Sequence, residues 1–143
     1  VPIKIRCEHY KRIDADYILI FNPCHPFIEL ETFKKTVQHV RETKYNSYTS
    51  VIPTVDWIFD NAGYPITNSN PKVISTTEST KFYKVAHAFH IIKPSFLRER
   101  HLLWTFTPND PSLIEISEKE AFDIDTEFEF TICELMHKSL GPQ

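Results

Sequence analysis

Short, mostly apolar runs separated by polar segments set the pattern of this chain and predict its strands. Residues 16–21 (DYILIF) and 85–92 (VAHAFHII) have the length and apolar character of strands that are buried on both faces. Residues 47–52 (SYTSVI) return to strand composition, and two further strands are predicted over 101–106 and 112–117. Together these segments predict a sheet at the centre of the fold.

Two segments place apolar residues at helical spacing. Residues 30–43 carry Phe33, Val37 and Val40 with polar residues between them, which predicts an amphipathic helix covering one side of the sheet. Residues 126–138 predict a second helix, opened by a Thr-x-x-Glu capping box. The apolar stripe of this second helix consists of Phe128, Ile132, Leu135 and Met136.

The order strand, helix, strand over residues 16–52 predicts a βαβ unit and a parallel sheet. The middle of the chain differs: a hairpin is predicted over 57–67 around an Asp-Asn-Ala-Gly turn, followed by a polar loop over 68–81. A short helical turn is predicted to begin at Pro94. The chain is therefore predicted to be an α/β protein.

Composition narrows the class of protein. With 143 residues, 41% of them hydrophobic, the chain suits one globular domain, and its net charge of −3 provides no basic field for nucleic acid or anionic lipid. No apolar run approaches the roughly 18 residues of a membrane span, and the N-terminal segment lacks the apolar core of a secretory signal. Three widely spaced cysteines, Cys7, Cys24 and Cys133, fit neither a disulfide scaffold nor a zinc ribbon. We expect a cytoplasmic protein.

The segment Asp123-Ile124-Asp125 carries the strongest candidate chemistry. It lies between a strand-like segment and the last helix, and alternation places both carboxylates on one side. Two carboxylates at the mouth of a sheet suit one Mg²⁺, which usually keeps water and phosphate oxygens as its other ligands. The alternative is structural: Asp125 caps the helix and Asp123 is a solvated turn residue. Spacing alone leaves both interpretations open.

Five blocks of the chain, in this order, resemble the acylneuraminate cytidylyltransferases, enzymes of the CMP-sialic acid synthetase type. The segment Asp-Ile-Asp-Thr-Glu, residues 123–127, is the most specific of the matches. The blocks are DYILIFNPCHPFIELETFKKTVQHV, SYTSVI, WIFDNAGYPI, VAHAFHIIKPSFL and FDIDTEFEFTICELM. The resemblance implies a Rossmann-like nucleotidyltransferase fold, a GT-A-like three-layer sandwich. It also implies a β-hairpin insertion within residues 56–117 that serves as a dimerisation arm, with residues 57–84 and 94–117 as the candidate interface.

The resemblance also implies a reaction: CMP passes from CTP to an acceptor oxygen, pyrophosphate leaves, and the product serves surface glycan synthesis such as capsule or lipooligosaccharide. Asp123 and Asp125 would be the catalytic, Mg²⁺-binding carboxylates. The residues implied near the acceptor are Asn22, Pro23, Cys24, His25, His87 and His90. The implied partners are CTP, a small-molecule acceptor and a second copy of the chain.

Two departures from the family pattern shape this hypothesis. Nothing matches the family's N-terminal Pro-Ala-Arg-x-Gly-Ser-Lys nucleotide loop, and the two glycines, Gly63 and Gly141, cannot build a phosphate cradle. The chain therefore resembles the later part of one domain, residues 1–143 being an incomplete cytidylyltransferase. The acceptor-side residues also differ, which leaves open another nonulosonic acid, another sugar or a small phosphorylated metabolite. The rival hypothesis is a non-catalytic α/β module for binding or assembly.

Two smaller predictions concern the acceptor side. His87 and His90 are three residues apart in a strand, so we expect their side chains to face opposite ways. Cys24 next to His25 invites a thiol-nucleophile interpretation, but neighbours in sequence rarely point at each other and no Asn or Asp partner is evident. Cys24 is better interpreted as a small buried residue or as part of a pocket wall.

Overall fold

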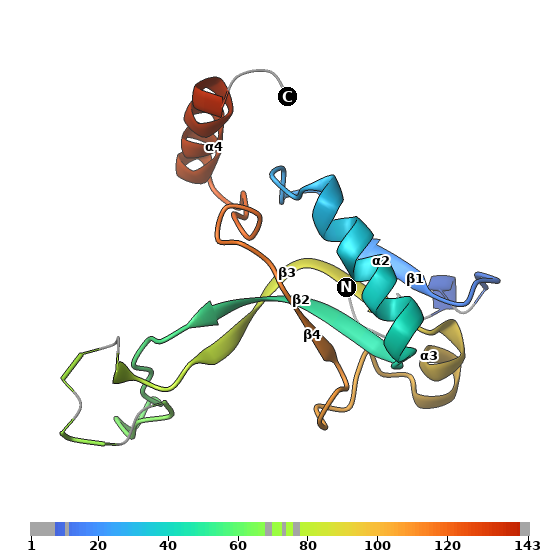
Figure 1. The fold of residues 1–143 in the computed structure, drawn as a ribbon, viewed down its shortest axis with the longest axis horizontal. Coiled ribbons are helices and arrows are strands. Elements are labelled where there is room, and N and C mark those ends of the chain that lie inside the picture. Colours follow the sequence, from blue (N-terminus) through green and yellow to red (C-terminus); the bar gives the residue numbers. More distant parts are fainter. Residues whose placement is uncertain (1–7, 11, 68–69, 73, 76–77, 141–143) are drawn as a thin grey trace.

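Four strands form one mixed sheet, in the order β1-β3-β2-β4 (Figure 1). The computed structural model describes residues 8–10, 12–67, 70–72, 74–75 and 78–140, so Cys7 lies outside the described residues. The strands are β1 (Ile18–Phe21), β2 (Ser47–Thr54), β3 (Phe82–Ile92) and β4 (Ser112–Glu115). The helices are α2 (Leu30–Thr43), α3 (Pro94–Arg100) and α4 (Glu127–Leu140).

The sheet corrects the prediction of an all-parallel arrangement. β1 and β2 run in the same direction and are joined through α2, as the strand-helix-strand pattern predicted. However, β3 lies between them and pairs antiparallel with both. Among the described strands, only β2 and β4 pair as parallel neighbours. A distant segment has inserted into the crossover, which no local pattern of apolar residues could indicate.

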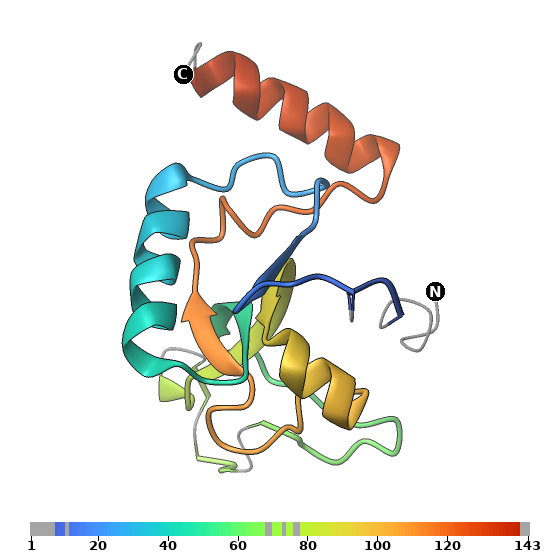
Figure 2. The same cartoon turned by 90° about the vertical axis from the view of Figure 1, so that its right-hand side faces the viewer.

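Helices cover both faces of the sheet. Val40 of α2 packs against Tyr48 and Phe89 in one buried cluster, while Leu97 of α3 packs against Ile92 on the opposite face. Ile91 and Ile92 belong to different clusters because successive side chains of a strand point to opposite faces. Figure 2 shows α2 and α3 on opposite sides of the strands. The predicted helix over 30–43 is confirmed at both ends.

β3 is interrupted by a bulge. Its pairing with β2 passes from His90–Thr49 to Val85–Val51, so β3 advances five residues (85 to 90) while β2 advances two (49 to 51). His87 lies within this step and adopts a left-handed backbone conformation, with φ of 57°. Such an irregularity re-aims the side chains of the longer strand.

Beyond the bulge, β2 and β3 extend away from the rest of the chain and lead into a long arm (Figure 1). The predicted hairpin over 57–67 is present as a tight turn: Phe59 and Pro65 form an antiparallel bridge, and the Asp60 side chain accepts hydrogen bonds from the Ala62 and Tyr64 amides. The arm exposes apolar side chains, with Tyr64 72% exposed. The predicted loop over 68–81 has no strand in its described part.

The prediction of a strand over 101–106 is wrong. His101 and Phe106 both have positive φ, and the Thr105 amide donates to the Asp110 carboxylate, so these residues fold into a turn before β4. Trp104 packs against the ring of His90 instead of extending the sheet.

The last helix, α4, stands apart from the sheet in both ribbon views (Figures 1 and 2). Its capping box is confirmed: the Glu129 amide donates to Thr126 Oγ1, and the Thr126 amide donates to the Glu129 carboxylate. The predicted apolar stripe does not pack into a core, since Phe128 is 74% exposed and Leu135 62%. No helix in the described part of the chain is long and apolar enough to cross a bilayer.

Candidate functional site

The loop that follows β1 is folded by its own polar groups. The Asn22 amide donates to the carbonyl of Ala88 on the neighbouring strand, at 2.9 Å. The Asn22 side-chain oxygen accepts from the Cys24 amide at 3.1 Å, and the Asn22 carbonyl accepts from the His25 amide at 3.2 Å. This turn, with Pro23 exposed at its tip, directs the His25 side chain inward.

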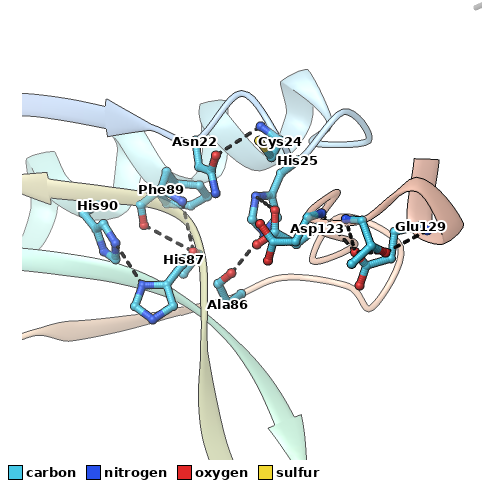
Figure 3. Close-up of polar contacts among 12 residues, drawn as sticks. Asn22, Cys24, His25, Ala86, His87, Phe89, His90, Asp123 and Glu129 are labelled. Atoms are coloured by element: carbon cyan, nitrogen blue, oxygen red, sulfur yellow. Dashed lines mark hydrogen bonds and ion pairs between the residues drawn. The ribbon is translucent and has the colours of Figure 1, made fainter. Parts of the chain in front are cut away.

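His25 is completely buried and connects three segments (Figure 3). Its Nε2 donates to the carbonyl of Ala86 in β3 at 3.0 Å, since a carbonyl can only accept. Its Nδ1 faces Oδ1 of Asp123 at 3.6 Å. Both of these facing atoms are buried, and neither has a hydrogen-bond partner among the described residues. A buried pair of this kind is costly, which distinguishes it from an ordinary core contact.

The backbone holds the Asp123 segment against the same loop. The Ile124 amide donates to the Cys24 carbonyl at 3.1 Å, so the segment before α4 lies beside the turn after β1. The Asp123 side chain is 35% exposed, which leaves it open to solvent on one side. The interpretation of Asp123 as a merely solvated turn residue is therefore wrong for Oδ1, which is buried.

Asp125 lies two residues further on and is exposed. Its amide donates to the Glu129 carboxylate at 3.0 Å. Thr126 occupies the position that caps α4, so the alternative role of Asp125 as the helix cap is wrong. Hydrogen bonds from Thr126 and from the Asp125 amide lower the pKa of Glu129 below its ordinary value. The shared Mg²⁺ role of Asp123 and Asp125 stays a prediction.

A second carboxylate, that of Glu120, holds the segment before Asp123 in place through hydrogen bonds. Glu120 is 5% exposed, and its oxygens accept from the Thr32 hydroxyl, the Glu29 amide, and the Ser117 amide and hydroxyl. Burial alone would raise the pKa of Glu120, but the hydrogen bonds from Thr32, Ser117 and Glu29 outweigh it and hold that pKa below its ordinary value. Glu120 thus ties the start of α2 to the turn that leads into Asp123.

The prediction that His87 and His90 face opposite ways is wrong. Their rings lie 5.4 Å apart in an edge-on arrangement, with His87 Nδ1 3.4 Å from His90 Nε2. The bulge at His87 changes the phase of the strand, so the alternation rule fails there. The Thr49 hydroxyl lies 2.8 Å from Nδ1 of His90 and holds that ring on its other side. The exposed His87 therefore ends a chain of three polar side chains.

The structure thus brings Asn22, Cys24, His25 and Asp123 together and places the two histidines on the neighbouring strand (Figure 3). Sequence reasoning missed Glu120 and the Ala86 carbonyl. A backbone carbonyl carries no sequence signal. Glu120 did carry a sequence signal, since it is an acidic residue just before the Asp-Ile-Asp segment. However, its burial depends on the distant Thr32.

The site can be tested for its fit to a divalent cation. In the described part of the chain, no three or more His, Cys, Asp or Glu side chains gather into a metal cluster. Asp123 Oδ1 is nevertheless a buried carboxylate oxygen without a hydrogen-bond donor. A cation whose remaining ligands are water and phosphate oxygens fits such an atom.

Comparisons with known proteins point to a fold. The chain matches no protein-family model. It also matches no curated protein sequence. Among solved structures it is similar to the 4-diphosphocytidyl-2C-methyl-D-erythritol synthase of Anaerococcus prevotii DSM 20548, with a TM-score of 0.63 at 16% identity. The match covers 96% of this chain and 67% of that one. At this identity the likeness shows that the two chains share a mixed α/β fold.

Proposed function

We propose that this chain takes part in CTP-dependent cytidylyl transfer, in which an acceptor oxygen attacks the α-phosphate of CTP and pyrophosphate leaves. The likeness in fold to a 4-diphosphocytidyl-2C-methyl-D-erythritol synthase supports the choice of a cytidine nucleotide as substrate in this proposal. The Rossmann-like, GT-A-like three-layer arrangement that the resemblance implies belongs to the same proposal.

One observation carries the proposal. The loop after β1 and the Asp-Ile-Asp segment are about a hundred residues apart in sequence, yet Ile124 bonds to Cys24 and Asp123 faces His25. A buried carboxylate oxygen without a hydrogen-bond partner among the described residues is an arrangement that functional sites retain and structural cores avoid. Its place beyond the carboxyl end of β1 is where ligands bind in open α/β sheets.

Asp123 and Asp125 would hold the Mg²⁺ ion of this reaction. When bound, Mg²⁺ neutralises charge on the phosphates during transfer. The chain's own residues then orient the reactants: Asn22 and the turn through Pro23 and Cys24 shape the acceptor side, with His25 behind them fixing the position of Asp123.

We propose an acidic acceptor, either a nonulosonic or related sugar acid or a small phosphorylated metabolite. The exposed imidazole of His87, backed by His90 and Thr49, is suited to an anionic group. With a sugar-acid acceptor we further propose a role in surface glycan synthesis, and we propose a cytoplasmic location. The arm also fits a homodimer, because Trp57, Phe59, Tyr64 and Ile66 expose apolar rings and chains.

A second candidate is a non-catalytic module that binds a related ligand or assembles with a partner. It is favoured by the sequence itself, which has two glycines in total and no glycine-rich phosphate loop. The two candidates differ in chemistry: the first releases pyrophosphate and the second only binds.

The test is pyrophosphate release followed by ³¹P NMR, using the natural polypeptide that carries this sequence, CTP, Mg²⁺ and a panel of sugar acids and phosphorylated metabolites. Acceptor-dependent release with CTP, and not with ATP or GTP, supports the transferase. Saturable binding of CTP or an acceptor in calorimetry, with no release, supports the non-catalytic module.

A further inference from the structure

The contact between His25 and Asp123 buries two polar atoms that have no hydrogen bond within the described part of the chain. His25 Nδ1 and Asp123 Oδ1 face each other at 3.6 Å in a buried position, and neither has a hydrogen-bond partner among the described residues. This distance is too long for a hydrogen bond between them. Both polar atoms are thus removed from water without a hydrogen bond to any described residue.

The Ala86 carbonyl decides which imidazole nitrogen carries the proton. Because Nε2 donates to that carbonyl at 3.0 Å, the neutral ring has its lone pair on Nδ1. The lone pair then points at a carboxylate oxygen, which is also an acceptor. A positive charge between the two atoms would compensate both of them: either a proton on Nδ1, which makes the contact an ion pair, or a bound cation.

A backbone carbonyl holding one imidazole nitrogen while the other is left free is the usual outer contact of a metal-binding histidine. The separation suits this role as well. An ion about 2.1 Å from each atom, the usual Zn–N and Zn–O distance, would span the 3.6 Å gap at a ligand–metal–ligand angle of roughly 118°, wider than the tetrahedral angle. His25 is completely buried, so its ring is already held in the orientation that ligation needs.

We propose that His25 Nδ1 and Asp123 Oδ1 are two ligands of a site for a divalent first-row transition-metal ion such as Mn²⁺ or Zn²⁺, which the site binds in preference to Mg²⁺. The remaining ligands are water and, during the reaction, phosphate oxygens. The inference rests on the proposed function only for these phosphate ligands. This mixed nitrogen and oxygen pair is distinct from the Asp123–Asp125 pair proposed for Mg²⁺ and shares only Asp123 with it.

The preference follows from ligand chemistry. Mg²⁺ favours oxygen ligands in octahedral geometry, whereas imidazole suits transition-metal ions. Replacing a second carboxylate by an imidazole also lowers the negative charge of the site. The hydrogen bond from His25 to the Ala86 carbonyl leaves Nδ1 available as a ligand and so favours an ion that coordinates nitrogen.

The direct test uses Mn²⁺ as the probe and needs no substrate. Electron paramagnetic resonance follows Mn²⁺ binding to the purified natural polypeptide, with Mg²⁺ as competitor. Electron spin echo envelope modulation then reports whether a ¹⁴N nucleus couples to the bound ion. We expect coupling to a histidine nitrogen in the unmodified protein. We also expect a tenfold excess of Mg²⁺ to displace no more than about half of the bound Mn²⁺, because the affinity for Mn²⁺ should be higher by about one order of magnitude or more.

The variants identify the nitrogen. His25→Ala and the bulkier His25→Gln should both lose the ¹⁴N coupling and weaken Mn²⁺ binding by about ten- to a hundredfold. The matched control is His39→Ala, a half-buried histidine whose Nε2 lies 3.2 Å from the Ser112 hydroxyl, and it should keep both properties. His87→Asn should also keep the coupling, which excludes His87 as its source.

Two results would overturn the proposal. One is a bound Mn²⁺ without histidine coupling in the unmodified protein, a result that does not depend on any variant folding. The other is no saturable Mn²⁺ or Zn²⁺ binding at all. Either result can occur while CTP-dependent release of pyrophosphate with Mg²⁺ is observed, so failure of this inference is distinguishable from failure of the proposed function.

Discussion

Two acidic residues three positions apart, Glu120 and Asp123, show what separates a structural carboxylate from a functional one. Glu120 is 5% exposed and accepts hydrogen bonds from Thr32, Ser117 and the Glu29 amide. Asp123 also has one buried oxygen, but among the described residues that oxygen has no hydrogen-bond partner and faces His25 at 3.6 Å. The same short segment therefore carries one satisfied and one unsatisfied buried acid.

The two residues differ in whether hydrogen bonds within the protein compensate the desolvation of the carboxylate. Hydrogen bonds repay the desolvation of Glu120 within the fold, so its carboxylate contributes to stability. No hydrogen bond from the described residues compensates the desolvation of the buried Asp123 oxygen. A ligand that supplies positive charge there would compensate it, and this compensation would favour binding. Substitutions at the two positions should therefore affect different properties.

The largest effect is expected on turnover. Asp123→Asn removes the negative charge that the proposed cation and phosphates require, and we expect kcat/KM for CTP-dependent pyrophosphate release to fall by about a hundred- to a thousandfold. The melting temperature should change little. Glu118→Gln, an exposed acid in the same segment, is the charge-matched control and should retain turnover. Full turnover in Asp123→Asn would remove Asp123 from the site.

The next effect concerns stability. Glu120→Ala leaves the Thr32 hydroxyl and the Ser117 and Glu29 amides without their acceptor, and we expect the free energy of unfolding to fall by about 2–3 kcal/mol. Urea denaturation measures this change, and Glu118→Ala serves as the matched control, with a change below about 0.5 kcal/mol. Equal stability of the two variants would mean that the Glu120 contacts do not support the fold.

The third prediction follows from the sign of the Glu120 pKa shift. The pKa of Glu120 is lowered from 4.5 in the folded protein, so its stabilising effect is fully present above that ordinary value and is lost as pH falls through the folded pKa. The difference in unfolding free energy between the unmodified protein and Glu120→Gln should be constant from about pH 6 to 8 and shrink below about pH 4.5. A difference that grows as pH falls would contradict this assignment.

The smallest effect is expected on the neighbouring strand. His87→Asn tolerates the left-handed backbone at this position but removes the imidazole that ends the Thr49–His90–His87 chain. We expect KM for the acidic acceptor to rise about tenfold, the loss of roughly one charge-assisted hydrogen bond, with kcat little changed. The control is His101→Asn, another exposed histidine with positive φ, which should leave KM unchanged.

Local patterns predicted those parts of the fold that local forces determine. The α2 helix was predicted at both ends, and the capping box of α4 was found as predicted, because spacing and caps act within a few residues. The insertion of β3 between β1 and β2 was not predicted, since strand order depends on contacts between distant segments. The absence of a strand over 101–106 has the same origin: Asp110 and His90 hold this segment from outside it.

The candidate site likewise has features that the sequence predicted and features that depend on distant residues. Residue types and the Asp-Ile-Asp segment indicated which side chains to examine, and the structure brings Cys24 and His25 to Asp123. The pairing of His87 with His90 depends on a bulge in β3, which strand alternation cannot indicate. The burial of His25 and Glu120 depends on partners more than fifty residues away, so it could not be read from either neighbourhood.

The free energy of unfolding of Asp123→Ala, compared with that of Glu120→Ala, tests the central contrast most directly and requires no knowledge of the substrate. We expect Asp123→Ala to be as stable as the unmodified protein or more stable, because a buried acceptor without a hydrogen-bond partner among the described residues is removed. A loss of about 2 kcal/mol or more, similar to that of Glu120→Ala, would contradict the account. It would show that Asp123 and His25 form a structural ion pair and not a site that awaits a ligand.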